Sequence, residues 1–362
     1  MWRYANPVDV QFGSGAFERL GEIVAGRPYC LVTYGESAFD ALAQQAAAFA
    51  GKPAAVVRNI GPNPDFATLT QSCRALQGKG PIATIVALGG GSVMDAAKVL
   101  AAAGDDFTRV RTFLETGKGA EALKATPIIA VPTTAGTGSE VTCWATVWDT
   151  DAKKKYSLSL PSLYPTCALV DPLLTLDAPR GVTVSSGLDA LSHALESIWN
   201  VHANPVSSVL AEFAAREVMA HLPRLARDLR NVELRERMAR AALFAGLAFS
   251  NTRTALAHSL SYHLTLHHGT PHGIACSFTL PMVMRGATGV SDDCDEALQR
   301  IFGADLERGA HQLEAFLQGL GIATDVASYG VAQDDWERLI DAAFQGDRGR
   351  NYIGRRVDFA GG

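Results

Sequence analysis

The feature that most limits the choice of fold lies in the first half of the chain, where short apolar runs alternate with segments of helical period. The runs that predict buried strands are Pro28–Tyr34, Pro53–Arg58, Thr84–Leu88 and Pro127–Val131. Helical patterns follow the first three: one ends at Ala50, and the others span Phe66–Gln77 and Val93–Ala103. Strands that alternate with helices form a parallel sheet whose two faces the helices cover. We therefore predict an α/β domain.

The second half differs, because long Ala- and Leu-rich stretches with helical period dominate it from about Gly181 onward. The predicted helices are Leu188–Asn200, Pro205–Ala220, Val232–Phe249 and Leu306–Leu317. The segment Asp171–Arg180 carries two prolines and no clear periodicity, which is typical of a domain boundary. We expect an α/β domain over residues 1–177 and an all-helical domain over residues 178–362.

Composition narrows the class of protein. The 362 residues are 48% hydrophobic and 19% charged, with a formal net charge of -5, so the chain is long and apolar enough for two cores. The absence of a Lys/Arg-rich run argues against a nucleic-acid partner. The sequence has no signal-peptide pattern and no apolar run long enough to span a membrane. The six cysteines are scattered without C-x-x-C pairs, which favours reduced thiols and the cytoplasm.

Two loops at predicted strand ends are rich in glycine and hydroxyl residues. The strand Thr84–Leu88 leads into Gly89-Gly90-Gly91-Ser92 and then a helix, and Pro127–Val131 leads into Pro132–Glu140 (PTTAGTGSE). Each could be a tight turn without a ligand, since neither matches the G-x-G-x-x-G pattern. However, the carboxyl ends of parallel strands meet at one edge, and free amides at a helix start favour anions. The two loops together therefore predict a phosphate-bearing ligand.

A candidate metal site comes from the predicted helical half. Asp189 and His193 are four residues apart and share one helical face, on a helix that Ser185 or Ser186 could cap. Five of the nine histidines fall within 15 residues of one another, from His258 to His272, among leucines. A solvated cluster without function is the plain alternative. One carboxylate with three of these imidazoles would suit Zn²⁺ or Fe²⁺, although spacing does not say which three.

Five motifs in order resemble the iron-containing (group III) alcohol dehydrogenase family. They are FGSGA, GGGSVMDAAK, PTTAGTGSE, DALSHALES and the block from His258 through PHG to Pro281, which together span residues 7–285. The resemblance implies an NAD(P)-dependent, metal-containing alcohol dehydrogenase or aldehyde reductase. It also implies a dinucleotide-binding domain, an all-helical metal domain and a homodimer.

The resemblance assigns residues to each site. Metal ligands for Fe²⁺ or Zn²⁺ map onto Asp189, His193, His258 and His272. Cofactor contacts map onto Asn63, Gly90, Gly91, Ser92, Asp95, Thr133, Thr134, Thr137, Ser139 and Lys155. His263, His267 and His268 then become neighbours of the metal site.

The chain departs from the family pattern at two positions. Many members carry an Asp after the first strand, which binds the adenosine ribose and repels a 2′-phosphate; here Tyr34 stands there, so we expect NADP as well as NAD to be accepted. Many members also carry a proton-relay His four residues after the first His of the second pair, and here that residue is Tyr262. Tyr262 or His263 then becomes the candidate proton donor, with solvent as the alternative.

The Tyr262 departure and the wording HSLSYHLT resemble one branch, the phosphonoacetaldehyde reductases (2-hydroxyethylphosphonate dehydrogenases). A phosphonate substrate needs cations, and the C-terminal stretch offers Arg348, Arg350, Arg355 and Arg356, although a solvated tail explains them equally well. The competing functions are a metal-free maleylacetate reductase, a dehydroquinate-synthase-like lyase, and a metal-binding protein without catalysis. The Asp and three His favour the metal-dependent reduction of an aldehyde to a primary alcohol, or its reverse.

Overall fold

The computed structural model describes residues 1–123 and 125–356, and these form two compact units. One unit, here the α/β unit, comprises Pro7–Thr134 and Ser139–Thr175. The other, the helical unit, comprises Met1–Asn6, Ala135–Gly138 and the chain from Leu176 onward. The predicted fold class, an α/β domain followed by an all-helical one, is confirmed; the predicted boundary at residues 177/178 stays a prediction, and residues 357–362 of its second range lie outside the described residues.

A six-stranded parallel sheet forms the centre of the α/β unit, with the strand order β1-β8-β5-β4-β2-β3. In that order the strands are Asp9–Phe12, Cys167–Val170, Ile128–Pro132, Thr84–Gly89, Tyr29–Tyr34 and Ala55–Ile60. The four predicted strands are present. The sequence reading missed β1 and β8, which are only four residues long each, and β1 is only partly buried.

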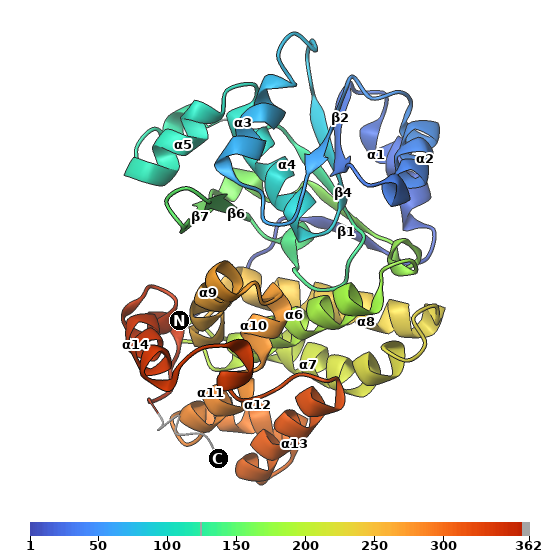
Figure 1. The fold of residues 1–362 in the computed structure, drawn as a ribbon. Coiled ribbons are helices and arrows are strands. Elements are labelled where there is room, and N and C mark those ends of the chain that lie inside the picture. The colour runs from blue at the N-terminus through green and yellow to red at the C-terminus, as the bar shows by residue number, and fades with distance from the viewer. Residues whose placement is uncertain (124, 357–362) are drawn as a thin grey trace. The chain divides into compact units, whose positions relative to one another are not determined.

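Helices cover both faces of this sheet, because the strands are apolar on both sides. Successive residues of β4 alternate between two apolar cores: Ile85 and Ala87 face one, and Val86 and Leu88 face the other. The first core is completed by α3 (Phe66–Arg74), α4 (Gly91–Ala103) and α5 (Phe107–Thr116), and the second by α1 (Leu20–Val24) and α2 (Asp40–Ala50), as Figure 1 shows. This sheet places the ends of β4 and β5 side by side.

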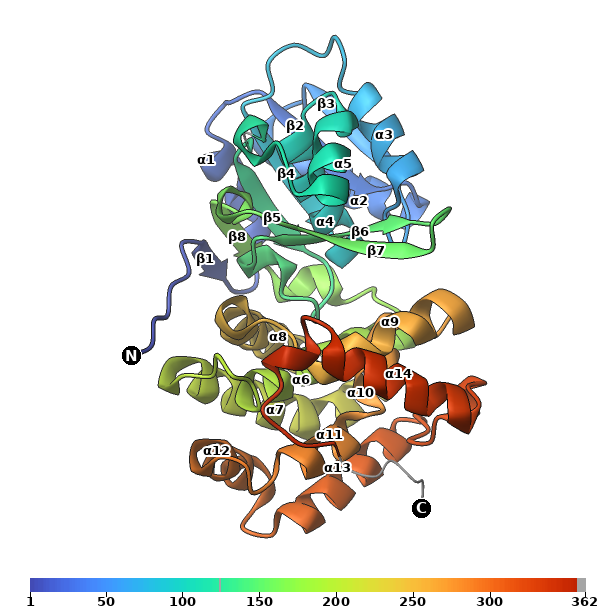
Figure 2. The same cartoon turned by 90° about the vertical axis from the view of Figure 1, so that its left-hand side faces the viewer.

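An antiparallel hairpin accompanies the parallel sheet and was not expected. It consists of β6 (Trp144–Asp149) and β7 (Lys154–Ser159), which Figure 2 shows as a separate ribbon. Its alternating polar residues match one buried and one exposed face. The hairpin packs against α4, the helix that follows the glycine-rich turn.

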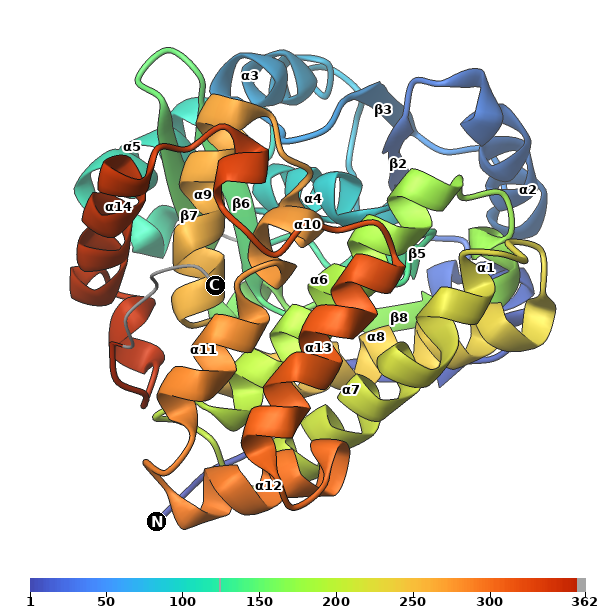
Figure 3. The ribbon, with the colours of Figure 1, turned by 60° about the horizontal axis from the view of Figure 1, so that its bottom comes forward.

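The helical unit has one apolar core, to which all of its longer helices contribute. These are α6 (Arg180–Ile198), α7 (Pro205–Leu225), α8 (Val232–Thr252), α9 (Leu256–His268), α10 (His272–Ser277), α11 (Leu280–Ala287), α12 (Asp292–Phe302), α13 (Leu306–Gly319) and α14 (Gln333–Gln345). Figure 3 shows α6, α9 and α10 as neighbours, which the packing of the three helices confirms. Among the described residues, no helix is long and apolar enough to cross a membrane.

Candidate metal centre and nucleotide-binding turns

Helix α6 supplies the first two predicted metal ligands. Asp189 and His193 stand one turn apart, and both side chains are buried. The helix begins at Arg180, so the expected cap at Ser185 or Ser186 is wrong; both serines lie inside the helix, and Pro179 occupies the cap position. The helix therefore begins about two turns before the apolar pattern that predicted it.

One carboxylate oxygen of Asp189 is the common neighbour of three imidazoles. Its Oδ1 lies 3.4 Å from His258 Nε2 on α9, 3.8 Å from His193 Nε2 and 3.9 Å from His272 Nε2 at the start of α10. Ligands about 2.1 Å from a tetrahedral metal stand about 3.4 Å apart, so these spacings are close to those of a coordination shell. The structure thus brings the four sequence-predicted ligands together.

A cysteine that the sequence reading missed completes the cluster. Single ligand atoms of Asp189, His258, His272 and Cys276 all lie within 4.8 Å of one another, and we call these four residues the metal group. Cys276 Sγ lies 3.9 Å from Asp189 Oδ1. The signal was available, because Cys276 follows His272 by four residues on one short helix. His193 stands beside the metal group, with its ring stacked on Phe249 and on His258.

Close packing holds α10 in place. A Cβ added to Gly273 would lie 1.8 Å from the backbone oxygen of Ser185, so only glycine lets α10 approach α6 this closely. His272, the residue before it, is thereby held over the face of α6 that carries Asp189. The Pro-His-Gly motif is therefore explained by packing as well as by ligation.

Glu196, a second residue that the sequence reading missed, orients His258. Its carboxylate is fully buried on α6, accepts from the Nδ1–H of His258 at 2.6 Å, and accepts from the backbone N–H groups of Ala255 and His258. Glu196 lies seven residues after Asp189 and so on the same helical face. A carboxylate that fixes one imidazole nitrogen leaves the other as a metal ligand.

The donor set fits a divalent cation. His258 Nε2 is buried and has no hydrogen-bond partner among the described residues, and it lies 3.4 Å from Asp189 Oδ1. Burial alone would raise the pKa of Asp189, but the imidazoles of His193, His258 and His272 outweigh it and lower that pKa. Burial lowers the pKa of His193 to about 4, which keeps a neutral ring. A metal ion would satisfy the orphaned nitrogen and the clustered lone pairs.

The two candidate proton donors lie in different surroundings. The ring of Tyr262 lies parallel to that of His272, with the centroids 6.5 Å apart, and the guanidinium of Arg348 stands 4.9 Å above the Tyr262 ring. Burial raises the pKa of Tyr262, with Arg348 opposing the rise. His263 instead faces His267 and His268, at centroid distances of 4.4 and 5.4 Å. Tyr262 is therefore the candidate that stands beside the metal group.

In the α/β unit, several predicted cofactor residues meet at the turn Gly89–Ser92, which we call the glycine turn. Ser92 Oγ accepts from the backbone N–H of Asn63, whose φ of 56° is left-handed. A Cβ on Gly90 would lie 3.0 Å from the Tyr34 hydroxyl and 3.2 Å from Thr134 Oγ1. Helix α4 starts at Gly91, so its free N–H groups point out of this turn. The arrangement offers backbone donors to an anion.

Asp95 and Ser139 bond to each other instead of standing open at the turn. Asp95 Oδ1 accepts from Ser139 Oγ and Oδ2 from the backbone N–H of Thr146. The buried ammonium of Lys98 donates to Ser139 and to the backbone oxygen of Trp144. Burial lowers the pKa of Lys98 to about 8, with Asp95 opposing the shift. This network ties α4 to the loop after β5 and to the hairpin.

The remaining predicted cofactor residues are spread out. Thr133 is buried, and its backbone N–H donates to the oxygen of Gly89. Lys155 lies on β7, with its ammonium 5.6 Å from the Trp148 ring centre. Thr137 belongs to Ala135–Gly138, a segment of the helical unit.

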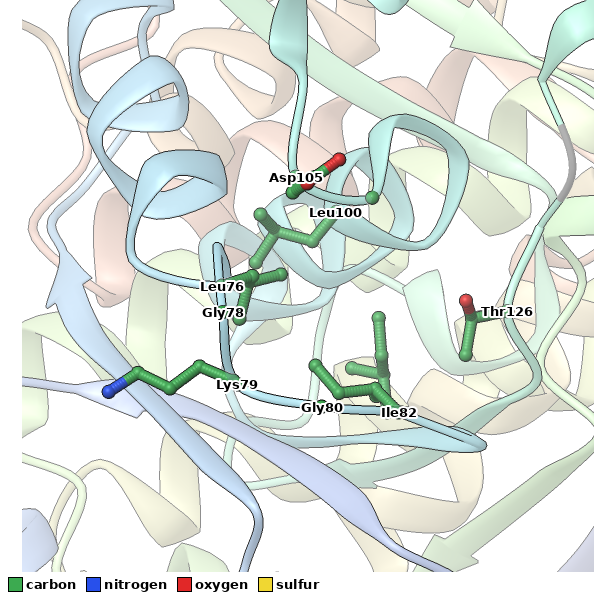
Figure 4. Close-up of a pocket in the computed structure, with 10 residues that line it drawn as sticks. Leu76, Gly78, Lys79, Gly80, Ile82, Leu100, Asp105 and Thr126 are labelled. Carbon is green, nitrogen blue, oxygen red and sulfur yellow. The ribbon is translucent and has the colours of Figure 1, made fainter.

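A pocket of about 270 Å³ in the α/β unit does not include these residues. It lies at the amino ends of β4 and β5, between Ile85, Leu100 and Thr126, whereas the glycine turn lies at the carboxyl end of β4. In Figure 4 the side chain of Lys79 extends away from Ile82 and Leu100, so it brings no cation into the hollow. The pocket has no feature of a nucleotide site.

Comparisons with known proteins identify the family of both parts of the chain. The family model of the iron-containing alcohol dehydrogenases matches residues 7–172, and that of the C-terminal part of the Fe-containing alcohol dehydrogenase family matches residues 183–353. The chain is 34% identical to a phosphonoacetaldehyde reductase of Streptomyces viridochromogenes, over 75% of this chain and 72% of that one. It is 32% identical to an NAD-dependent methanol dehydrogenase of Bacillus methanolicus, over 72% and 70%. A solved structure of sulfoacetaldehyde reductase from Bifidobacterium kashiwanohense in complex with NAD⁺ superimposes with a TM-score of 0.91, at 30% identity over 99% and 96% of the two chains.

Proposed function

The chain belongs to the iron-containing alcohol dehydrogenase family, and we propose that it reduces small aldehydes bearing a phosphonate or sulfonate group to primary alcohols. Reduced nicotinamide is the proposed hydride donor, in keeping with the relatives whose names include NAD. The reverse reaction, oxidation of the alcohol, uses the same groups.

The position of Arg348 carries this proposal. Its guanidinium covers the ring of Tyr262, which lies parallel to the ring of His272 in the metal group. The Nε–H of Arg348 donates to Thr254 Oγ1 at 3.0 Å, which fixes the plane of the guanidinium. The terminal nitrogens then form a two-pronged donor of the kind that suits phosphonate and sulfonate oxygens.

The other C-terminal arginines are engaged elsewhere. Arg350 pairs with Asp347, and Arg356 pairs with Asp341. Arg355 donates to the backbone oxygen of Gly289. The ion pairs of the described residues leave Arg348 without a carboxylate, and of the four arginines it is the one that stands over Tyr262 beside the metal group.

The metal group and His193 would hold the cation and orient the aldehyde. A bound divalent cation would act as a Lewis acid toward the aldehyde oxygen, which stabilises developing negative charge by several kcal/mol. Reduced nicotinamide would supply a hydride, with its electron pair, to the carbonyl carbon, and the alkoxide oxygen that results needs one proton to become the alcohol. Tyr262 is the proposed donor, because its ring lies parallel to that of His272 in the metal group and a phenol is protonated at neutral pH.

The glycine turn, Asn63, Thr134 and the residues around them are the proposed cofactor contacts. The amides at the start of α4 would receive the pyrophosphate. Tyr34 brings no carboxylate to the end of β2, so a 2′-phosphate meets no repulsion from this residue. We therefore propose that NADPH is accepted besides NADH. A preference for NADH above roughly a thousandfold, about 4 kcal/mol, would refute this role of Tyr34.

Turnover of a matched aldehyde panel tests the substrate. Phosphonoacetaldehyde, sulfoacetaldehyde and propanal are compared by kcat/KM in the wild type, Arg348→Gln and Arg350→Gln. Hydrogen bonds to charged groups contribute about 1.5–3 kcal/mol, so Arg348→Gln should lower kcat/KM for the anionic aldehydes about 10- to 100-fold. Propanal should be unaffected, and Arg350→Gln should resemble the wild type. Equal losses on all three aldehydes, or a wild-type preference for propanal, would contradict the proposal.

A further inference from the structure

The proposed reaction makes no use of three histidines at the end of α9. His263, His267 and His268 occupy the last two turns of that helix, after His258 and Tyr262. His263 is half-buried, whereas His267 and His268 are exposed. None of them belongs to the metal group.

Their rings gather at one place. His263 and His267 stand one helical turn apart, with ring centroids 4.4 Å apart, and His268 lies 5.4 Å from His263. Paired imidazoles one turn apart on a helix can chelate a metal, since their nitrogens reach a common point about 2.0–2.1 Å from each. The two exposed rings can rotate about their side-chain torsions to meet the third.

Groups from other segments close the surroundings of this cluster. His268 Nδ1 lies close to Gly330, 3.6 Å from where a Cβ would be, so bare backbone leaves room beside the ring. Asp335, in the first turn of α14, exerts an attraction on His263. Figures 1 and 3 show α14 beside α9, in agreement with their packing. The Asp335 carboxylate already pairs with Arg338, one turn along α14, so the three imidazoles are the ligands that this cluster itself offers.

We propose that His263, His267 and His268 form a second metal site for Zn²⁺ or a similar divalent transition metal. Burial and the neighbouring His267 and His268 lower the pKa of His263, so its ring is neutral at physiological pH and retains a lone pair. The site is separate from the metal group and does not depend on the substrate proposed above.

The number of metal equivalents bound by the full-length enzyme tests the site. Enzyme loaded with its catalytic metal is dialysed against micromolar Zn²⁺, and total metal per chain is measured by mass spectrometry. The wild type should bind two equivalents of metal per chain. The double variant His267→Ala/His268→Ala should bind one equivalent tightly, and its affinity for a second equivalent should be at least tenfold weaker than that of the wild type. Activity in zinc-free buffer reports whether the variant is folded.

The matched control is His311→Ala, which removes another exposed histidine, one that pairs with Glu307 and Glu314. It should still bind two equivalents. One equivalent in the wild type would overturn the proposal, and so would two tightly bound equivalents in the active double variant.

Discussion

The metal group of the helical unit is built from side chains, whereas the glycine turn of the α/β unit is built from backbone. In the metal group, atoms from α6, α9 and α10 converge on one oxygen of Asp189. In the glycine turn, donors come from the start of α4, and the nearby side chains Tyr34 and Thr134 crowd Gly90. Function in the first region depends on which residue is present; in the second it depends on the absence of a side chain.

The two regions also treat a buried carboxylate differently. Asp189 is surrounded by imidazoles, which outweigh burial and lower its pKa. Burial dominates at Glu140, beside the network of Lys98, and raises its pKa to about 7. A low dielectric disfavours charge in both places, so the number of cationic neighbours decides the outcome. The metal group therefore holds a charged ligand, whereas the acid in the loop after β5 keeps its proton until the pH approaches about 7.

The largest effect is expected for Asp189→Asn, which removes the charge at the centre of the metal group. The cation supplies several kcal/mol to the reaction, so turnover should fall at least about a thousandfold as metal content falls. Glu196→Gln leaves every ligand in place and should weaken metal affinity only about 10- to 100-fold, because it disturbs the orientation of His258. Metal analysis and aldehyde turnover measure both. Full metal content and wild-type turnover in Asp189→Asn would remove the proposed centre.

Glu140→Gln tests the contrast between the two carboxylates through stability. The pKa of Glu140 rises from its ordinary value of 4.5 to about 7, so between these values the unfolded chain has lost a proton that the native chain keeps. The contribution of Glu140 to the free energy of unfolding is therefore fully present below about pH 4.5. It is lost as the pH rises through about 7, by up to about 3 kcal/mol. In urea unfolding, the free energy of unfolding of the wild type should fall between pH 5 and 7.5, and Glu140→Gln should lack this dependence on pH. Identical slopes in the two proteins would refute the raised pKa.

Local patterns in the sequence predict most of the α/β unit, but of the metal group only Asp189, together with its neighbour His193. Asp189 and His193 are found because a helix places residues four apart on one face. The order of strands and helices follows from apolar runs such as Thr84–Leu88. Cys276 and Glu196 have the same kind of spacing, but nothing local says that α6, α9 and α10 pack together. That packing depends on distant contacts such as Gly273 against Ser185.

The polar networks show the same limit. Asp95 was expected near the cofactor from its place after the glycine turn, yet both of its oxygens accept bonds from residues more than forty positions away. The strand that supplies Thr146 has a strand-like sequence (WATVWD), but its partner β7 is polar (KKYSLS), and no local pattern places the hairpin against α4. Spacing along a helix can be read from a sequence, whereas the partner that reaches a buried polar group depends on the tertiary fold.

The smallest effect is expected for Gly90→Ala. This variant tests directly whether the glycine turn depends on the absence of a side chain. The added Cβ would lie 3.0 Å from the Tyr34 hydroxyl and 3.2 Å from Thr134, so the turn must shift. Such crowding costs about 1–3 kcal/mol, so NADH should bind about tenfold more weakly, while metal content stays unchanged. Gly181→Ala is the control, since open space surrounds that position. Titration of NADH fluorescence measures both variants. Wild-type affinity in Gly90→Ala would mean that the cofactor does not depend on this turn, and a loss of metal would mean that the two regions are not independent.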